Sequence, residues 1–477
     1  MLLTESTFLF LFLPLFIVLH VAVTAATTAD WLRGSVPLRA LNAFLLGGSI
    51  VYFAALAPWL AVTLVAATTF TYGVGLSIAR GRARGVWLAI GIAGILALFV
   101  LVRSRNALAQ NVGVLALPLN GRTGRPEGLT AIVVSFFSLS AIACLVDTYR
   151  KPVGTDLHPV RVGLSLLFFP FLLAGPIVTR REMEEQLIRR MVTVANFAYG
   201  MRRFAIGLFK KLAIADTVGL VSDTIFALPP TQVAAARAWL GLLCFTLQIY
   251  FAVSAYSDMA LGLGRMFGFR LSVSENFKWP YVARSLHEFW EKWLSTLSQW
   301  LRDYLRLPLG AGPLGPMVIA FLIVGVWHGT RWTLLIWALY HAFFVAAERL
   351  GLARVLRVLP APVRHVYVVL VVMIGWVFFR APTVSAALLY VKALAGFSMP
   401  VSSAYYLSRF LTPEVWLAIL SGLIGAAPLV RAIGRWRVAI DGATTALAVM
   451  AFAVLVYIWR MGVRLVTSPL KPHQPSA

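Results

Sequence analysis

The sequence predicts an all-α polytopic membrane protein. Of its 477 residues, 60% are hydrophobic and only 13% are charged, which argues against a water-soluble fold with a polar shell. Long apolar runs recur along the chain, and a helix needs about 20 apolar residues to cross a bilayer. The runs lack the alternation of a transmembrane barrel. We therefore expect every span to be a helix, because backbone polar groups inside lipid must be satisfied within the segment.

The apolar runs predict about eleven transmembrane helices, since adjacent runs form either one long span or two short ones. We expect residues 1–470 to form a single transmembrane domain, followed by a polar tail at 471–477. The predicted spans are 8–25, 41–57, 58–78, 86–102, 129–147, 161–179, 236–256, 315–327 with 331–347, 364–379, 414–431 and 442–459.

The formal net charge of +24 has a topological explanation. Basic residues cluster between spans, near 80–84, 150–151, 202–203, 210–211 and 431–437, where Lys and Arg hold loops on the cytoplasmic side and meet anionic lipid. No basic run is interleaved with aromatic residues in a water-exposed domain, so a nucleic-acid partner is not expected. The two cysteines lie in apolar runs, and His20, His158, His365 and His473 have no carboxylate at metal-ligand spacing, so no metal site is expected either.

Two stretches are expected to lie at the membrane interface or to bend. Residues 180–212 mix charged and apolar positions, which predicts an amphipathic interfacial region and not a span. A Gly-Pro pair at 175–176 ends an apolar run, which favours a re-entrant or tightly bent segment there.

Residues 285–306 predict one amphipathic helix. Its apolar positions follow steps of three and four, and Glu288 and Lys292 lie four residues apart on the opposite face. Helix-breaking residues at 276–280 and 308–316 separate this helix from its neighbours. A helix with one apolar and one charged side inside a membrane protein is expected at the bilayer interface or in the wall of a polar cavity.

Polar residues also interrupt the apolar run 245–269. They include Asp258, which is expensive at membrane depth unless it faces protein or water. Two interpretations remain open: an ion pair with a nearby arginine such as Arg265, or a part in shaping a substrate tunnel. The other interrupting residues are Gln248, Ser254, Tyr256 and Ser257.

His328 is the most specific candidate for chemistry. It lies between two apolar runs, with Trp327 before it and Gly329 after it. A single histidine in this position is either a hydrogen-bonded packing residue or a catalyst. His341, in the following span, is the alternative.

The order of these features resembles the membrane-bound O-acyltransferase family, in particular its bacterial subgroup that acts in alginate O-acetylation and in D-alanyl transfer to teichoic acid. The resemblance covers much of the chain from about 130 to 400, which would be the catalytic core. The matching stretches are 169–177, 207–216, 247–262, 275–310, 325–337 and 375–381, and the most specific pair is Trp300 to Leu305 followed by Trp327 to Gly329.

The resemblance implies a catalytic histidine, here His328, in a tunnel through the membrane. It further implies acetyl-CoA as the acyl donor with no permanently bound cofactor, a polysaccharide or other hydroxyl acceptor, and an extracytoplasmic partner of the serine-hydrolase type. The location would be the bacterial inner membrane. The residues expected to line or support the tunnel are Trp327, Gly329, Trp300, Arg302, Asp303, Tyr256, Ser257, Asp258, Gln248 and His287.

The chain also departs from the subgroup. Leu294 stands where a second histidine is usual, and His287 lies on nearly the same helical face two turns earlier. Three functions from different classes therefore remain: an O-acyltransferase that uses His328, a transporter with a polar pathway, and a membrane scaffold for a partner. A transporter would predict inverted repeats with broken helices, and no such internal symmetry is visible in the sequence.

Overall fold

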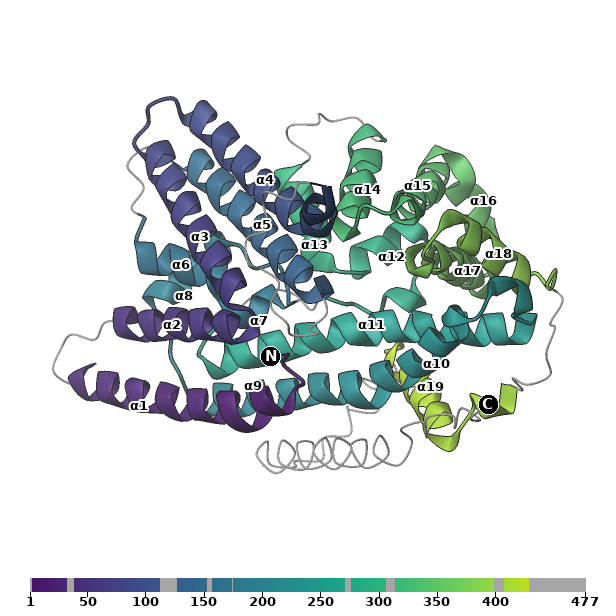
Figure 1. Cartoon of the computed structure of the whole chain (residues 1–477), viewed down its shortest axis with the longest axis horizontal. Helices are drawn as coiled ribbons and strands as arrows, with labels where there is room; N and C mark the ends of the chain where they lie inside the picture. The colour runs from purple at the N-terminus through teal and green to yellow at the C-terminus, as the bar shows by residue number, and fades with distance from the viewer. Residues whose placement is uncertain are drawn as a thin grey trace, which may run out of the picture.

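The computed structural model describes residues 2–31, 38–111, 127–151, 157–173, 175–270, 276–305, 314–398 and 407–428. Within these residues every regular element is a helix, as the sequence predicts (Figure 1). The predicted span 442–459 and the polar tail 471–477 lie outside the described residues.

The helices before the long central helix are mostly spans and short connecting segments. In chain order they are η1 (Phe8–Phe12), α1 (Leu13–Trp31), α2 (Leu38–Leu56), α3 (Pro58–Ala79), α4 (Arg84–Asn111), α5 (Glu127–Arg150), α6 (Pro159–Leu167), α7 (Phe169–Leu172), α8 (Arg180–Ile188), α9 (Val194–Phe209), η2 (Lys210–Ala215), α10 (Asp216–Ala227) and η3 (Pro230–Gln232).

The central helix and those after it carry the stretches with the candidate residues. They are α11 (Ala235–Met266), η4 (Pro280–Val282), α12 (Leu286–Lys292), α13 (Ser295–Tyr304), α14 (Gly315–His328), α15 (Trp332–Ala347), η5 (Glu348–Leu352), α16 (Ala353–Val358), α17 (Ala361–Arg380), α18 (Val384–Leu394), η6 (Leu407–Arg409) and α19 (Pro413–Gly425).

Eight helical segments of the described chain are long and apolar enough to cross a membrane, and each overlaps a predicted span. Neither α8 nor α9 is among them, in agreement with the prediction that 180–212 is not a span. The eight are Phe8–Ala26, Leu38–Leu56, Pro58–Ala79, Arg84–Arg103, Thr130–Arg150, Ala235–Met266, Trp332–Val358 and Ala361–Arg380.

Three predicted spans are shorter or divided. The run 161–179 becomes α6 and α7, because Phe168 adopts an extended conformation and Pro170 can only begin a new helix. The run 315–327 is the 14-residue helix α14, and the part of 414–431 that is described is the 13-residue helix α19. These shorter apolar helices cannot each cross about 30 Å of hydrocarbon on their own.

The longest helix, α11, runs through the middle of the molecule (Figure 1). α9 lies along it, and glycines on both helices allow the backbones to meet. A β-carbon on Gly262 would lie 2.7 Å from the carbonyl oxygen of Gly200, and one on Gly200 would lie 2.4 Å from that of Gly262. This close approach brings the basic residues of α9 and η2 against α11.

Two groups of helices stand on either side of a connecting pair. α3, α4 and α5 pack together in one group, and α14, α15 and α17 pack together in the other (Figure 1). α13 packs on α5, whereas α12 packs on α15. The pair α12–α13 therefore bridges the two groups. Side chains of both groups can meet next to this pair.

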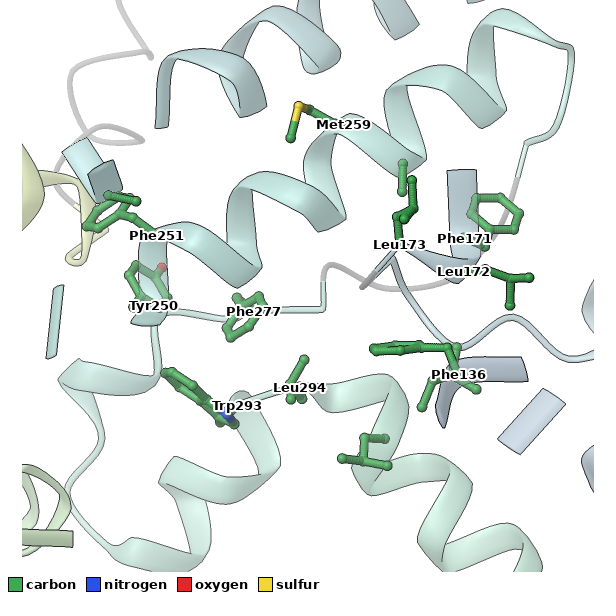
Figure 2. Close-up of a cluster of buried hydrophobic side chains, with 14 of the residues drawn as sticks. Phe136, Phe171, Leu172, Leu173, Tyr250, Phe251, Met259, Phe277, Trp293 and Leu294 are labelled. Atoms are coloured by element: carbon green, nitrogen blue, oxygen red, sulfur yellow. The ribbon is translucent and has the colours of Figure 1, made fainter. Parts of the chain in front are cut away.

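The prediction of one continuous helix over 285–306 is wrong. The chain breaks after Lys292, because Leu294 adopts a left-handed conformation with φ 44° and ψ 57°. Asn276 holds the break: its carbonyl oxygen accepts from the N–H of Ser295, and its Oδ1 accepts from Thr296. Apolar contacts hold it as well, since Figure 2 shows Trp293 and Leu294 below Tyr250 of α11, with Phe277 between.

Candidate functional site

A cavity of about 980 Å³ lies between the two helix groups, and residues of α12 and α13 form one of its walls. His328 is one of its lining residues, and we refer to it as the histidine cavity. Its wall is mainly apolar and aromatic, which is typical of a small-molecule site with a few polar groups. Its lining includes Arg103 from α4, Ser135 and Phe136 from α5, Val253 from α11, His287, Trp293, Leu294 and Arg302 from the bridging pair, Trp327 and His328 from α14, and Trp337, Trp376 and Phe379.

His328 is the last residue of α14, and aromatic rings fix its side chain. The imidazole centroid lies 4.8 Å from that of Trp327, 5.6 Å from Trp337 and 5.0 Å from Phe379, each in an edge-on arrangement. The side chain is half-buried, and its ring nitrogens make no hydrogen bond to any residue that the structure describes. The ring is thus held in place with its nitrogens available to a bound molecule.

Arg103 supports the end of α14. Its guanidinium donates to the main-chain carbonyl oxygen of His328 and, at 3.2 Å, to Ser135 Oγ. The last carbonyls of a helix lack partners within the helix, and a cation there also suits the helix dipole. Trp327 Nε1 also donates a hydrogen bond of 3.5 Å to the Ser135 carbonyl oxygen. The sequence did not identify Arg103 as part of the site. Its only feature there is its position at the end of the apolar run 86–102, which is common for a basic residue at the end of a span.

The bridging pair forms one wall of the histidine cavity and is tied to its surroundings by polar contacts. The Glu348 carboxylate accepts from the backbone N–H of Leu286 at 2.8 Å, at the start of α12. At the other end, Trp300 Nε1 donates to the Leu139 carbonyl oxygen at 3.0 Å, and the Tyr304 hydroxyl donates to Asp147 at 3.0 Å. These contacts hold α12 against α15 and η5, and α13 against α5.

Three of the residues expected around His328 share its cavity. His287, Arg302 and Trp327 line the histidine cavity with it. Trp300, Asp303 and Gly329 lie next to lining residues but are not part of the lining, and the Asp303 carbonyl oxygen accepts from Arg150 at 2.8 Å. Residues from four of the matching stretches, 247–262, 275–310, 325–337 and 375–381, therefore line one cavity.

The polar residues of α11 lie elsewhere. Asp258 is paired with Arg203 at 3.0 Å and with Lys210 at 2.7 Å, and Lys210 also donates to Ser254. Asp258 is thus in an ion pair, but Arg265 is not its partner; the Arg265 guanidinium lies 5.2 Å from the ring centroid of Tyr199. Neither Asp258 nor the other expected α11 residues, Gln248, Tyr256 and Ser257, line the histidine cavity.

His341 lies deeper than His328. It is fully buried among Trp290, Trp337 and Trp376, with ring centroids 4.8, 5.4 and 6.4 Å away. Neither ring nitrogen has a hydrogen-bond partner among the described residues, and the side chain does not line the histidine cavity. Of the two candidate histidines, only His328 is open to a molecule in that cavity.

Comparisons with known proteins find a matching family and several relatives. The model of the membrane-bound O-acyltransferase family matches residues 158–391. The chain is 36% identical over 417 residues to a probable alginate O-acetylase of Azotobacter vinelandii. The aligned region covers 81% of this chain and 76% of that protein. A protein of the same name in Pseudomonas aeruginosa is 36% identical over 419 residues, covering 83% and 75%. A peptidoglycan O-acetyltransferase of Helicobacter pylori is 30% identical over 373 residues, covering 70% and 69%.

Proposed function

This chain belongs to the membrane-bound O-acyltransferase family, and from that premise we propose that it moves acetyl groups from acetyl-CoA to hydroxyl groups of an envelope or extracellular polysaccharide, with His328 as its catalytic residue. The observation that carries the proposal is the half-buried imidazole of His328, held by three aromatic rings and open to a cavity of about 980 Å³. The protein is a multi-pass membrane protein and an O-acyltransferase. The bacterial inner membrane is the proposed location.

His328 would act as a general base. A neutral imidazole nitrogen accepts the proton of the acceptor hydroxyl while the hydroxyl oxygen attacks the thioester carbonyl carbon. A C–O bond forms, the C–S bond breaks, and the departing thiolate takes up the proton from the imidazolium. Because no described side chain occupies the ring nitrogens, an acceptor hydroxyl can bind to one of them directly.

The aromatic wall supports this chemistry. Trp327, Trp337 and Phe379 present ring edges around the imidazole and favour one orientation of its plane. An apolar cavity also limits water, which would otherwise hydrolyse the thioester.

The acceptor is proposed from the relatives. The proteins of Azotobacter and Pseudomonas are named as probable alginate O-acetylases, and the Helicobacter protein is named as a peptidoglycan O-acetyltransferase. Both names describe acetylation of a carbohydrate polymer, which favours a polysaccharide hydroxyl here. An extracytoplasmic protein of the serine-hydrolase type is the proposed partner that completes the transfer.

The test uses purified protein in detergent with acetyl-CoA radiolabelled in the acetyl group. The parent should hydrolyse or transfer the acetyl group, and His328→Ala should lose this activity by roughly two or more orders of magnitude, as removal of a general base does. His158→Gln is the matched control, because His158 lies in the turn before α6 and does not line the histidine cavity. Equal rates in the parent and in folded His328→Ala would overturn the proposal, and a scaffold function would then take its place.

A further inference from the structure

Arg103 brings a positive charge into the histidine cavity, next to His328. Its side chain lines the cavity, and its guanidinium donates to the His328 carbonyl oxygen and, at 3.2 Å, to Ser135 Oγ. Gly329 leaves room for this group, because a β-carbon there would lie 3.4 Å from Arg103 Nη2. The guanidinium and the proposed catalytic residue are therefore neighbours in the cavity wall.

No carboxylate neutralises this charge within the part of the chain that the structure describes. Arg103 forms no ion pair there. Glu291 is the only carboxylate among the described lining residues; it belongs to α12, is more than half exposed and lies 3.5 Å from His287. An unpaired cation in a mainly apolar cavity is costly, so the cavity is best balanced when it holds an anion.

The two hydrogen bonds of Arg103 leave donors on its guanidinium. Each terminal nitrogen carries a second hydrogen, and no further described residue accepts from this side chain. A structural role at the end of α14 needs only the bond to the His328 carbonyl oxygen. Arg331 has such a role at the end of α17, where it donates to the carbonyl oxygens of Phe379 and Ala381, and it does not line the cavity. Capping a helix therefore does not explain why the Arg103 guanidinium lines the histidine cavity.

The proposed acyl transfer creates an anion close to His328. When the acceptor hydroxyl attacks, its proton moves to the imidazole, and an electron pair of the thioester carbonyl moves onto the carbonyl oxygen. This oxyanion lasts until the electron pair returns, the C–S bond breaks and the thiolate takes up the proton. Donors that are already in place around such an oxygen stabilise the transition state, because they need no reorganisation during the reaction.

We propose that Arg103 is a second catalytic residue, whose guanidinium donates to the oxyanion of the tetrahedral intermediate. This inference rests on the proposed function, from which the thioester and the attacking hydroxyl are taken. A carboxylate on the acceptor is the alternative anion. The oxyanion is favoured because it forms within reach of the hydroxyl that His328 holds, and the guanidinium is bonded to that same residue. The bond that positions His328 and the bond to the oxyanion use different hydrogens, so Arg103 can make both.

The test compares two analogues of acetyl-CoA that cannot release an acetyl group, each bound to the purified full-length protein in detergent. S-acetonyl-coenzyme A has a planar ketone carbonyl, like the donor before attack. Its trifluoromethyl counterpart adds water at the carbonyl and presents a tetrahedral carbon, like the intermediate. The parent should bind the trifluoromethyl analogue more tightly, since an active site is complementary to the transition state. Arg103→Gln should reduce this preference by about tenfold or more, with little change in affinity for the ketone. An unchanged preference would overturn the proposal.

Further variants separate a contact with the oxyanion from an effect on the position of the imidazole. Glutamine can still donate to the His328 carbonyl oxygen but has no charge, whereas Arg103→Lys keeps the charge and should retain part of the preference. Arg331→Gln is the matched control, because it removes an arginine from a helix end outside the cavity, and it should retain the full preference. His328→Ala should retain most of it. If His328→Ala loses the preference as fully as Arg103→Gln, Arg103 acts only through His328 and the proposal is overturned.

The remaining outcomes show which proposal fails. If Arg103→Gln keeps the preference and instead raises the KM for an acidic oligosaccharide, but not for its methyl ester, the anion is a carboxylate of the acceptor and the oxyanion assignment is overturned. Acetyl release that depends on His328, together with a preference that does not depend on Arg103, would leave the proposed function standing and refute this inference alone. A parent that releases no acetyl group from acetyl-CoA would overturn the proposed function and this inference with it.

Discussion

Arg103 donates a hydrogen bond to the main-chain carbonyl oxygen of His328, a residue 225 positions later in the chain. The bond joins the end of α4, in one helix group, to the end of α14, in the other. Arg103 also donates to Ser135 Oγ of α5, so one guanidinium links three helices around the histidine cavity. The position of the imidazole in that cavity therefore depends on a residue outside the family's matched range of 158–391.

Arg103→Ala should lower acetyl transfer by about ten- to a hundredfold, since a small displacement of a catalytic group is enough for such a loss. Arg103→Lys should retain part of the rate, because an ammonium group can still donate to the carbonyl oxygen. Rates at saturating and at low acetyl-CoA would show the loss mainly in kcat. Ser135→Ala, which removes only one partner of Arg103, should have a smaller effect. A rate for Arg103→Ala equal to that of the parent would show that the bond does not position His328.

Asp258 should contribute to stability and not to the chemical step. Its carboxylate is 15% exposed and pairs with both Arg203 and Lys210, so Asp258→Asn leaves two cations without their partner. We expect a loss of about 1–3 kcal/mol, between the values for exposed and buried pairs. Thermal or denaturant unfolding in detergent measures it. In Asp223→Asn, where the carboxylate is 57% exposed and pairs with Arg380, the loss should stay below about 1 kcal/mol.

The Asp258 pairs show what sequence could and could not predict. The long apolar spans were predictable, because hydrophobic length alone identifies them, and eight of the predicted runs are helices of sufficient length. The partner of Asp258 was not predictable. Arg265 is closer along the chain, but α9 packs along α11 and brings Arg203 and Lys210 to the carboxylate. Contacts between helices far apart in sequence leave no local pattern.

The close approach of α9 and α11 depends on the absence of a side chain at Gly262. In Gly262→Ala the new methyl group would lie 2.7 Å from the Gly200 carbonyl oxygen and 2.7 Å from the Phe204 backbone nitrogen, so the helices must separate. We expect a destabilisation of about 1–3 kcal/mol, typical of overpacking.

The control is Gly73→Ala in α3, where a β-carbon meets nothing within 4 Å. That change should be neutral or stabilising by up to about 1 kcal/mol, because alanine favours helix more than glycine does. Melting temperatures in the same detergent compare the two. If both variants melt alike, the contact between the two helix backbones is not as close as 2.7 Å in solution.

The candidate site was also predicted only in part, because local motifs can be recognised in the sequence and contacts between distant segments cannot. The Trp-His-Gly stretch identified His328, and the bridging residues His287 and Arg302 do reach its cavity. The break at Leu294 was missed because the apolar positions on both sides keep a helical period. A leucine also has no local preference for positive φ. Only the tertiary contacts of Asn276 and the aromatic cluster around Trp293 impose the break.

The left-handed conformation of Leu294 predicts a reversed order of two substitutions. Leu294 is buried, with 9% of its surface exposed, so both Leu294→Ala and Leu294→Gly lose apolar contacts and destabilise the protein. At φ 44° an alanine is strained by about 1–2 kcal/mol, whereas glycine is not. The glycine variant should therefore be the more stable of the two by about 1 kcal/mol.

At Leu297, which is buried within α13 and lines the histidine cavity, the glycine variant should be less stable than the alanine variant by about the same amount. The four unfolding curves test this, and the same order at both positions would mean that residue 294 is helical and that α12 and α13 form one helix in solution.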